Sequence, residues 1–228
     1  MRTITLVAYN RLGYLKQLVA SLQTNILDGY TLFIGVEPTD QTVVDFCQKL
    51  DFMPTVVTLN RQRLGVSANP LATISRAFDS GSEFNIALED DLVISPDALD
   101  LAEWFRCLQN NNYFCLNLFN YGSDPNQAEL VMELDHFAPL GWACTARVWF
   151  DWILPNWTVD ARGWDFSVNS VLATYGPKKV LAPQLARANH IGRDGGAHCT
   201  PELHDRFFSC LRISDGQNRH YRLKPEVP

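Results

Sequence analysis

The chain has 228 residues, and its 19 basic and 25 acidic residues give a net charge of −6 at pH 7. Apolar residues make up 46% of the chain, enough to build a sizeable core, which excludes intrinsic disorder. The acidic balance argues against a nucleic-acid partner, because that affinity comes largely from lysine and arginine neutralising phosphates.

Membrane and secretory signals are missing from the sequence pattern. No apolar run is long enough to predict a transmembrane segment, and the run from Ile4 to Ala8 is too short for a signal peptide. None of the six cysteines stands in a CxxC pair, so no zinc or thioredoxin motif is predicted. We therefore expect a cytoplasmic protein with free thiols, or the soluble catalytic domain of a longer protein.

The first half of the chain alternates buried strands with amphipathic helices. Strands are expected over 3–9, 31–36, 55–59 and 83–88, and helices over 12–22, 42–50 and 70–79. This order predicts an α/β fold with a largely parallel sheet.

The second half is less regular. Ser95-Pro96 is expected to open a helix, with the serine as its N-cap. A strand is expected over 113–119, a helix over 165–175 and another strand near Val180. Because no repeat or linker separates the halves, we predict a single domain over 1–228.

An acidic triplet, Glu89-Asp90-Asp91, follows the expected strand at 83–88. Open α/β sheets bind ligands beyond the carboxyl ends of their strands. Carboxylates there suit Mg²⁺ or Mn²⁺, which proteins hold through one or two carboxylates plus substrate phosphates. A solvated acidic turn is the alternative.

The segment from Arg187 to His198 holds two arginines, two histidines and three glycines. Arginine binds phosphate through two parallel hydrogen bonds, and glycine lets the backbone approach a ligand closely. Such a loop could close over a diphosphate, and an ordinary surface loop is the alternative.

Trp164-Asp165 begins an expected helix, and tryptophans cluster between 142 and 164. Asp165 is either a helix cap or a general base. We expect most of these tryptophans to be buried. One or two of them, with Trp142 and Trp164 as the first candidates, are expected to stack on an acceptor sugar.

In this order the features resemble the family of inverting glycosyltransferases that contains N-acetylglucosaminyltransferase I and protein O-mannose β-1,2-N-acetylglucosaminyltransferase. The matching residues are Glu89-Asp90-Asp91 with Pro96-Asp97, the segment 137–142, Pro155-Asn156-Trp157, Trp164-Asp165, and Pro183, Arg187, Gly192, Arg193, Gly195 and His198. The resemblance covers 84–198.

The resemblance implies a GT-A fold, with a nucleotide-sugar-binding half over 1–112 and an acceptor and catalytic half over 113–228. It implies a UDP-GlcNAc donor and Mn²⁺ (or Mg²⁺). The implied metal ligand is Asp91, and the implied donor-binding residues are Asn10, Arg11, Glu37, Glu89, Asp90, Arg187, Arg193 and His198.

The family has two adjacent aspartates after its tryptophan, one of them the base, whereas here Phe166 follows Asp165. Asp165 is therefore the expected base, with Asp160 as the alternative. The predicted activity is metal-dependent, inverting transfer of a sugar, GlcNAc by resemblance, to a hydroxyl of a glycan or other acceptor.

Two other functions remain open. A nucleotidyltransferase acting on a sugar phosphate should carry a glycine-rich phosphate loop after its first strand, and 8–13 lacks that density. A non-catalytic carbohydrate-binding protein on the same fold would bind sugar without a metal.

Overall fold

The computed structural model describes residues 1–108, 110, 112–158, 163–174, 179–196, 199–217 and 219–225. Its strands are β1 (Arg2–Ala8), β2 (Tyr30–Val36), β3 (Thr55–Leu59), β4 (Phe84–Glu89), β5 (Leu92–Ile94), β6 (Tyr113–Asn117), β7 (Leu130–Leu134), β8 (Trp142–Thr145), β9 (Lys179–Pro183), β10 (Ala188–His190) and β11 (Arg222–Leu223). Its α-helices are α1 (Leu12–Leu22), α2 (Gln41–Gln48), α3 (Gly65–Asp79), α4 (Ala98–Cys107), α5 (Ala146–Val148), α6 (Trp164–Thr174) and α7 (Pro201–Phe207). No helix within these ranges is both long and apolar enough to cross a membrane.

The described strands form one large sheet and one small one. The large sheet has nine strands in the order β11-β7-β9-β6-β8-β4-β1-β2-β3. Strands β1 to β4 are parallel, as predicted for the first half, while β8 runs antiparallel between β4 and β6. In the small sheet β5 pairs antiparallel with β10, with His190 opposite Leu92 and Ala188 opposite Ile94.

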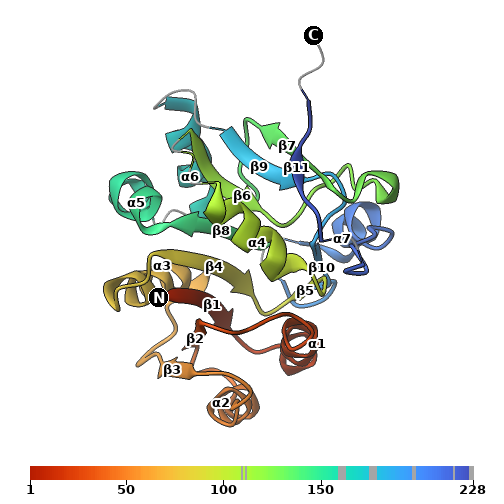
Figure 1. Cartoon of the computed structure of the whole chain (residues 1–228). Coiled ribbons are helices and arrows are strands. Elements are labelled where there is room, and N and C mark those ends of the chain that lie inside the picture. The colour runs from red at the N-terminus through yellow and green to blue at the C-terminus, as the bar shows by residue number, and fades with distance from the viewer. Residues whose placement is uncertain are drawn as a thin grey trace.

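Helices cover both faces of the large sheet (Figure 1). Side chains such as Ile4 and Leu6 pack with α1, α2 and α4 on one face. On the other face Ala87 and Trp142 pack with α3, α5 and α6. Because successive strand residues point to opposite faces, a sheet buried on both sides needs the nearly continuous apolar strands that the sequence displays.

Helix α3 begins at Gly65, five residues earlier than expected, and includes Pro70. Proline removes one hydrogen bond from a helix interior. The start is nevertheless stabilised, because the carboxylate of Glu37 accepts hydrogen bonds from the N–H groups of Leu64 and Gly65. Packing of the buried Ile74 against the sheet side further offsets the cost of the proline.

Ser95 is not the N-cap of α4, contrary to the expectation. The helix begins at Ala98 with Asp97 as its N-cap residue, and no side chain caps it. The Ser95 hydroxyl instead donates to Asp97 Oδ1 at 2.7 Å. The other oxygen of that carboxylate binds Arg187, so Asp97 is held by a contact distant in sequence.

Candidate active site

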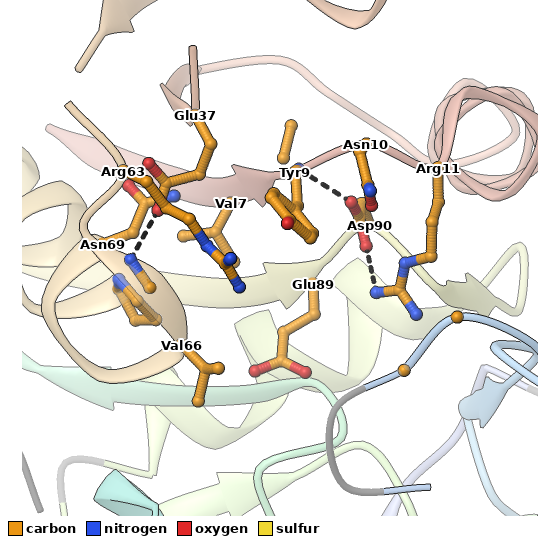
Figure 2. A pocket seen from close by; sticks show the side chains of 15 residues that line it. Val7, Tyr9, Asn10, Arg11, Glu37, Arg63, Val66, Asn69, Glu89 and Asp90 are labelled. Atoms are coloured by element: carbon orange, nitrogen blue, oxygen red, sulfur yellow. Dashed lines mark hydrogen bonds and ion pairs between the residues drawn. The ribbon is translucent and has the colours of Figure 1, made fainter. Parts of the chain in front are cut away.

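A cavity of about 370 Å³ lies where β1, β2 and β4 end (Figure 2). Five residues predicted to bind the donor line it: Asn10, Arg11, Glu37, Glu89 and Asp90. Gly195 and Gly196 of the glycine-rich segment also line it, although they lie far away in sequence. The strand ends and this segment therefore meet at one pocket.

Asp90 is fixed at the pocket by two hydrogen bonds. Its Oδ2 accepts from the backbone N–H of Tyr9 at 2.9 Å, and its Oδ1 accepts from Arg11 Nη2 at 2.6 Å. Arg11 Nη1 also lies 2.8 Å from Asp91 Oδ2. Burial alone would lower the pKa of Arg11, but the charges of Asp91 and Asp90 raise it, so the guanidinium stays charged.

Asp91 is 5% exposed and sits between two cationic or hydrogen-bonding groups. His190 Nε2 lies 3.0 Å from its Oδ2. Burial would raise the pKa of Asp91, but His190 and Arg11 outweigh it and lower that pKa, which keeps the carboxylate ionised. Gly192 is required beside it, because a Cβ there would lie 2.4 Å from Asp91 Oδ2.

The residues at Asp91 fit a divalent cation. Asp91 Oδ1 is buried and has no hydrogen-bond partner in the described part of the chain, and a buried acceptor left in this state is costly. The described residues contain no group of three His, Cys, Asp or Glu side chains able to hold a metal. Such a site suits an ion held by one carboxylate and completed by phosphate oxygens, which is how proteins commonly bind Mg²⁺.

Glu89 ends β4 and points into the pocket (Figure 2). Burial, together with the charges of Asp91 and Asp90, raises the pKa of Glu89 to about 8. The charge of Asp165 adds to this shift, which places Asp165 within electrostatic reach of the pocket.

The raised pKa of Glu89 predicts a pH-dependent loss of stability in metal-free protein. The folded state binds this proton more tightly than the unfolded state, so stability falls as pH rises from the ordinary glutamate pKa towards about 8. Glu89→Gln removes the titration. With a chelator present, we expect the variant to gain melting temperature over wild type at pH 8 but not at pH 4. An equal difference at both pH values would contradict the shift.

Arg63 is a pocket residue that the sequence analysis missed. It stands just before α3, and its Cζ lies 4.7 Å from the centre of the Tyr9 ring. Its guanidinium extends into the pocket (Figure 2). In the described ranges no carboxylate lies within ion-pair distance of it. Only its position in the loop before a helix at the strand ends could have suggested this role.

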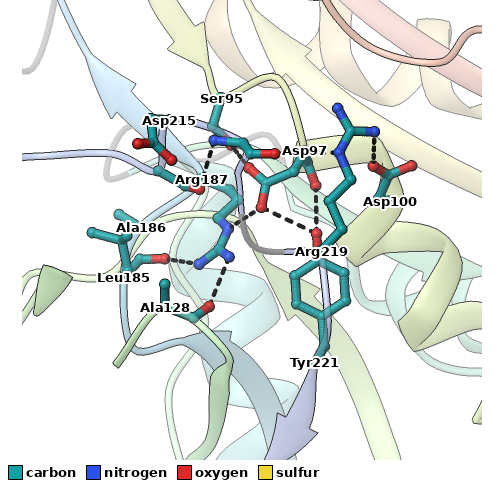
Figure 3. Close-up of polar contacts among 12 residues, drawn as sticks. Ser95, Asp97, Asp100, Ala128, Leu185, Ala186, Arg187, Asp215, Arg219 and Tyr221 are labelled. Atoms are coloured by element: carbon teal, nitrogen blue, oxygen red, sulfur yellow. Dashed lines mark hydrogen bonds and ion pairs between the residues drawn. The ribbon is translucent and has the colours of Figure 1, made fainter. Parts of the chain in front are cut away.

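Arg187 does not reach the pocket, which corrects the expectation that it binds the donor. The side chain is fully buried, and its Nε donates to Asp97 Oδ2 at 3.0 Å (Figure 3). Its other nitrogens donate to the carbonyls of Leu185 and Ala128, and it lies over the ring of Tyr221. All three nitrogens and one face of this guanidinium therefore contact other parts of the protein.

Arg187→Met should therefore lower stability without changing nucleotide affinity. Breaking a buried ion pair typically costs about 3–5 kcal/mol, because one charge is left without its partner. Chemical denaturation would measure the loss, and titration of the folded fraction with nucleotide would measure affinity. A stable variant that had lost nucleotide binding would restore Arg187 to the donor site.

The other basic residues of the glycine-rich segment differ in placement. Arg193 is paired through two nitrogens with Asp205 on α7, at 2.9 and 3.0 Å, and does not line the pocket. His198 lies outside the described residues, as does Asp160. The segment thus contributes backbone to the pocket through Gly195 and Gly196.

Trp142 and Trp164, the two tryptophans expected to contact an acceptor sugar, are both almost fully buried. They are 2% and 4% exposed, and Trp164 stacks on Trp157 with ring centres 4.6 Å apart. Both rings border a small hollow that Glu89 also lines. Asp165 lies in the first turn of α6, directly after Trp164.

The sequence matches no known family model and no curated protein. The structure is similar to the mannosyltransferase PcManGT from Pyrobaculum calidifontis, solved with GDP-Man and Mn²⁺, with a TM-score of 0.63 at 12% identity, covering 86% of this chain and 58% of that one. It is also similar to S. aureus TarS 1-349 in complex with UDP-GlcNAc, with a TM-score of 0.63 at 14% identity, covering 90% of this chain and 63% of that one.

These similarities establish the fold. The predicted fold class is confirmed: the chain has a mixed α/β fold with a large sheet flanked by helices, similar to the folds of PcManGT and TarS. The chain spans less than two thirds of the length of either structure.

Proposed function

We propose that the protein is a metal-dependent, inverting glycosyltransferase that uses a UDP-sugar as its donor, with UDP-GlcNAc as the first candidate. One observation carries the proposal. At the strand ends, Arg11 and Arg63 line one pocket. Arg11 also contacts an ionised carboxylate beside this pocket, Asp91, whose second oxygen has no partner in the described residues. A nucleoside diphosphate with its cation matches both charges.

Separate residues are assigned to the diphosphate, the ribose, the base and the sugar of the donor. Arg63 and Arg11 bind the diphosphate, while Asn10 and Asp90 lie beside the ribose. Glu37 shapes the base site indirectly, because its carboxylate is already occupied by the start of α3. Glu89 faces the sugar. Mn²⁺ or Mg²⁺ at Asp91 would neutralise the leaving diphosphate.

The acceptor hydroxyl attacks from the side of α6 in this proposal. Asp165 takes its proton as the hydroxyl approaches C1 of the donor sugar, on the face opposite the leaving diphosphate. Inversion follows from that single displacement. The acceptor is a glycan or another hydroxyl compound.

The two structural relatives support a nucleotide-sugar donor without deciding which one. One was solved with GDP-Man and Mn²⁺, the other with UDP-GlcNAc. The experiment therefore incubates the protein with UDP-GlcNAc, UDP-Glc, UDP-Gal and GDP-Man. Release of nucleoside diphosphate is followed with Mn²⁺, with chelator, and after Mn²⁺ is restored.

Release from UDP-GlcNAc that stops with chelator and returns with Mn²⁺ is the expected result. The anomeric configuration of the product, read by NMR, tests inversion. Binding of free sugar with no metal dependence would favour the carbohydrate-binding alternative. Pyrophosphate release from a nucleoside triphosphate and a sugar phosphate would favour the nucleotidyltransferase.

A further inference from the structure

The guanidinium of Arg11 is the positive charge that pairs with the acidic triplet. Its guanidinium contacts Asp90 through Nη2 at 2.6 Å and Asp91 through Nη1 at 2.8 Å. Both carboxylates are almost fully buried, whereas the Arg11 side chain is 18% exposed. One arginine thus bridges the two aspartates where a divalent cation fits.

This arrangement leaves hydrogen-bonding capacity unused on both sides. Arg11 Nε and Nη1 are buried and, across the described ranges, have no hydrogen-bond acceptor; Nη1 lies near Asp91 without the alignment of a hydrogen bond. Asp91 Oδ1 likewise lacks a donor there. Because buried polar groups without partners are costly, an anion bound to the arginine and a cation bound to the aspartate would both stabilise the cluster.

The side chain of Arg11 also has space into which it can move. It lines the same pocket as Arg63, and the neighbouring chain is Gly195 and Gly196, which present no side chains to it. Even an added Cβ at Gly195 would stay 3.8 Å from Arg11 Cδ. At Gly195 and Gly196 the pocket wall is therefore backbone, which leaves the long Arg11 side chain room to turn towards the pocket.

We propose that Arg11 and the divalent cation compete for Asp91, so that metal and donor bind cooperatively by exchange. Before the donor arrives, Arg11 holds the carboxylates and opposes metal binding. When a diphosphate enters, Arg11 turns its unused donors to the phosphate oxygens, and Asp91 is left to the cation. The identity of the anion rests on the proposed function; the competition at Asp91 does not.

The test measures Mn²⁺ binding without nucleotide, by the loss of the free-ion electron paramagnetic resonance signal. A positive charge a few ångströms from the metal is a strong repulsion in a partly buried site, so Arg11→Gln should bind Mn²⁺ about tenfold or more tighter than wild type. Arg63→Gln is the matched control. It removes one charge from the same pocket but contacts no carboxylate in the described ranges, so its Mn²⁺ affinity should change much less than that of Arg11→Gln.

The second measurement repeats the titration with saturating UDP. UDP should tighten Mn²⁺ binding strongly in wild type and much less in Arg11→Gln, and by linkage Mn²⁺ should tighten UDP binding by the same factor. Arg11→Lys keeps the charge but loses the planar fork, so a folded variant with Mn²⁺ affinity between those of wild type and Arg11→Gln is expected.

Unchanged or weaker Mn²⁺ binding by Arg11→Gln, with the fold verified by circular dichroism, would overturn the proposal. If Arg11→Gln does not fold, the comparison of Arg11→Lys with wild type decides it in the same way. If UDP binds to no form of the protein, the proposed donor is wrong, while the nucleotide-free titration still decides whether Arg11 competes with the metal.

Discussion

Asp91→Asn should abolish Mn²⁺-dependent binding of UDP and reduce sugar transfer by about two orders of magnitude or more. Asparagine keeps the shape of the side chain but removes the charge that attracts the cation. Among the described residues, it also leaves Arg11 with only Asp90 as an ionic partner. Calorimetric titration of UDP with and without Mn²⁺ measures the effect.

The control for this variant is Asp100→Asn, which removes a carboxylate that pairs with Arg219 away from the pocket. Its UDP affinity should equal that of wild type. Thermal melting in chelator verifies that Asp91→Asn remains folded. If the folded variant still bound UDP with a normal dependence on Mn²⁺, Asp91 would have to be removed from the proposed metal site.

Asp165→Asn should lower turnover by about 10²–10⁴, the usual contribution of a positioned general base. Donor affinity should change little, because the base acts in the transition state. The alternative is that Asp165 only stabilises the first turn of α6. That alternative gives the carboxylate no part in the chemistry, so it predicts normal turnover for the same variant.

Single-turnover kinetics with saturating donor separate these outcomes, and calorimetry with UDP and Mn²⁺ reports donor affinity. Asp160→Asn is the matched comparison, since it removes the other candidate carboxylate. Normal turnover in Asp165→Asn together with a large loss in Asp160→Asn would make Asp160 the base.

The strands of the first half and the place of the acidic triplet could be predicted from the sequence. Both depend on local pattern. Continuous apolar runs mark strands buried on both faces, and the triplet follows such a run directly. The boundary of α3 could not be predicted in this way, because Glu37, which directly follows β2, stabilises its start.

The role of an arginine was harder to predict than its position. Arg187 and Arg193 stand in the glycine-rich segment that resembles a phosphate loop, yet each is paired with an aspartate outside the pocket. Arg63 stands in no recognised motif and lies in the pocket. Whether an arginine is free for a ligand depends on the carboxylates that the fold brings near it, and sequence spacing does not reveal those.

The small sheet of β5 and β10 has a consequence for the order of folding. Its two ends are joined by the contacts Asp91–His190 and Asp97–Arg187, whose partners are 99 and 90 residues apart in the chain. Closing such a long loop has a large entropic cost, so these contacts form late in folding. During synthesis, the N-terminal partner of each contact is also made first. A nascent chain therefore exposes the acidic triplet well before the strand that fixes Asp91 exists. In a refolding experiment, capture of Mn²⁺ in the presence of UDP should appear later than recovery of the far-ultraviolet circular dichroism signal.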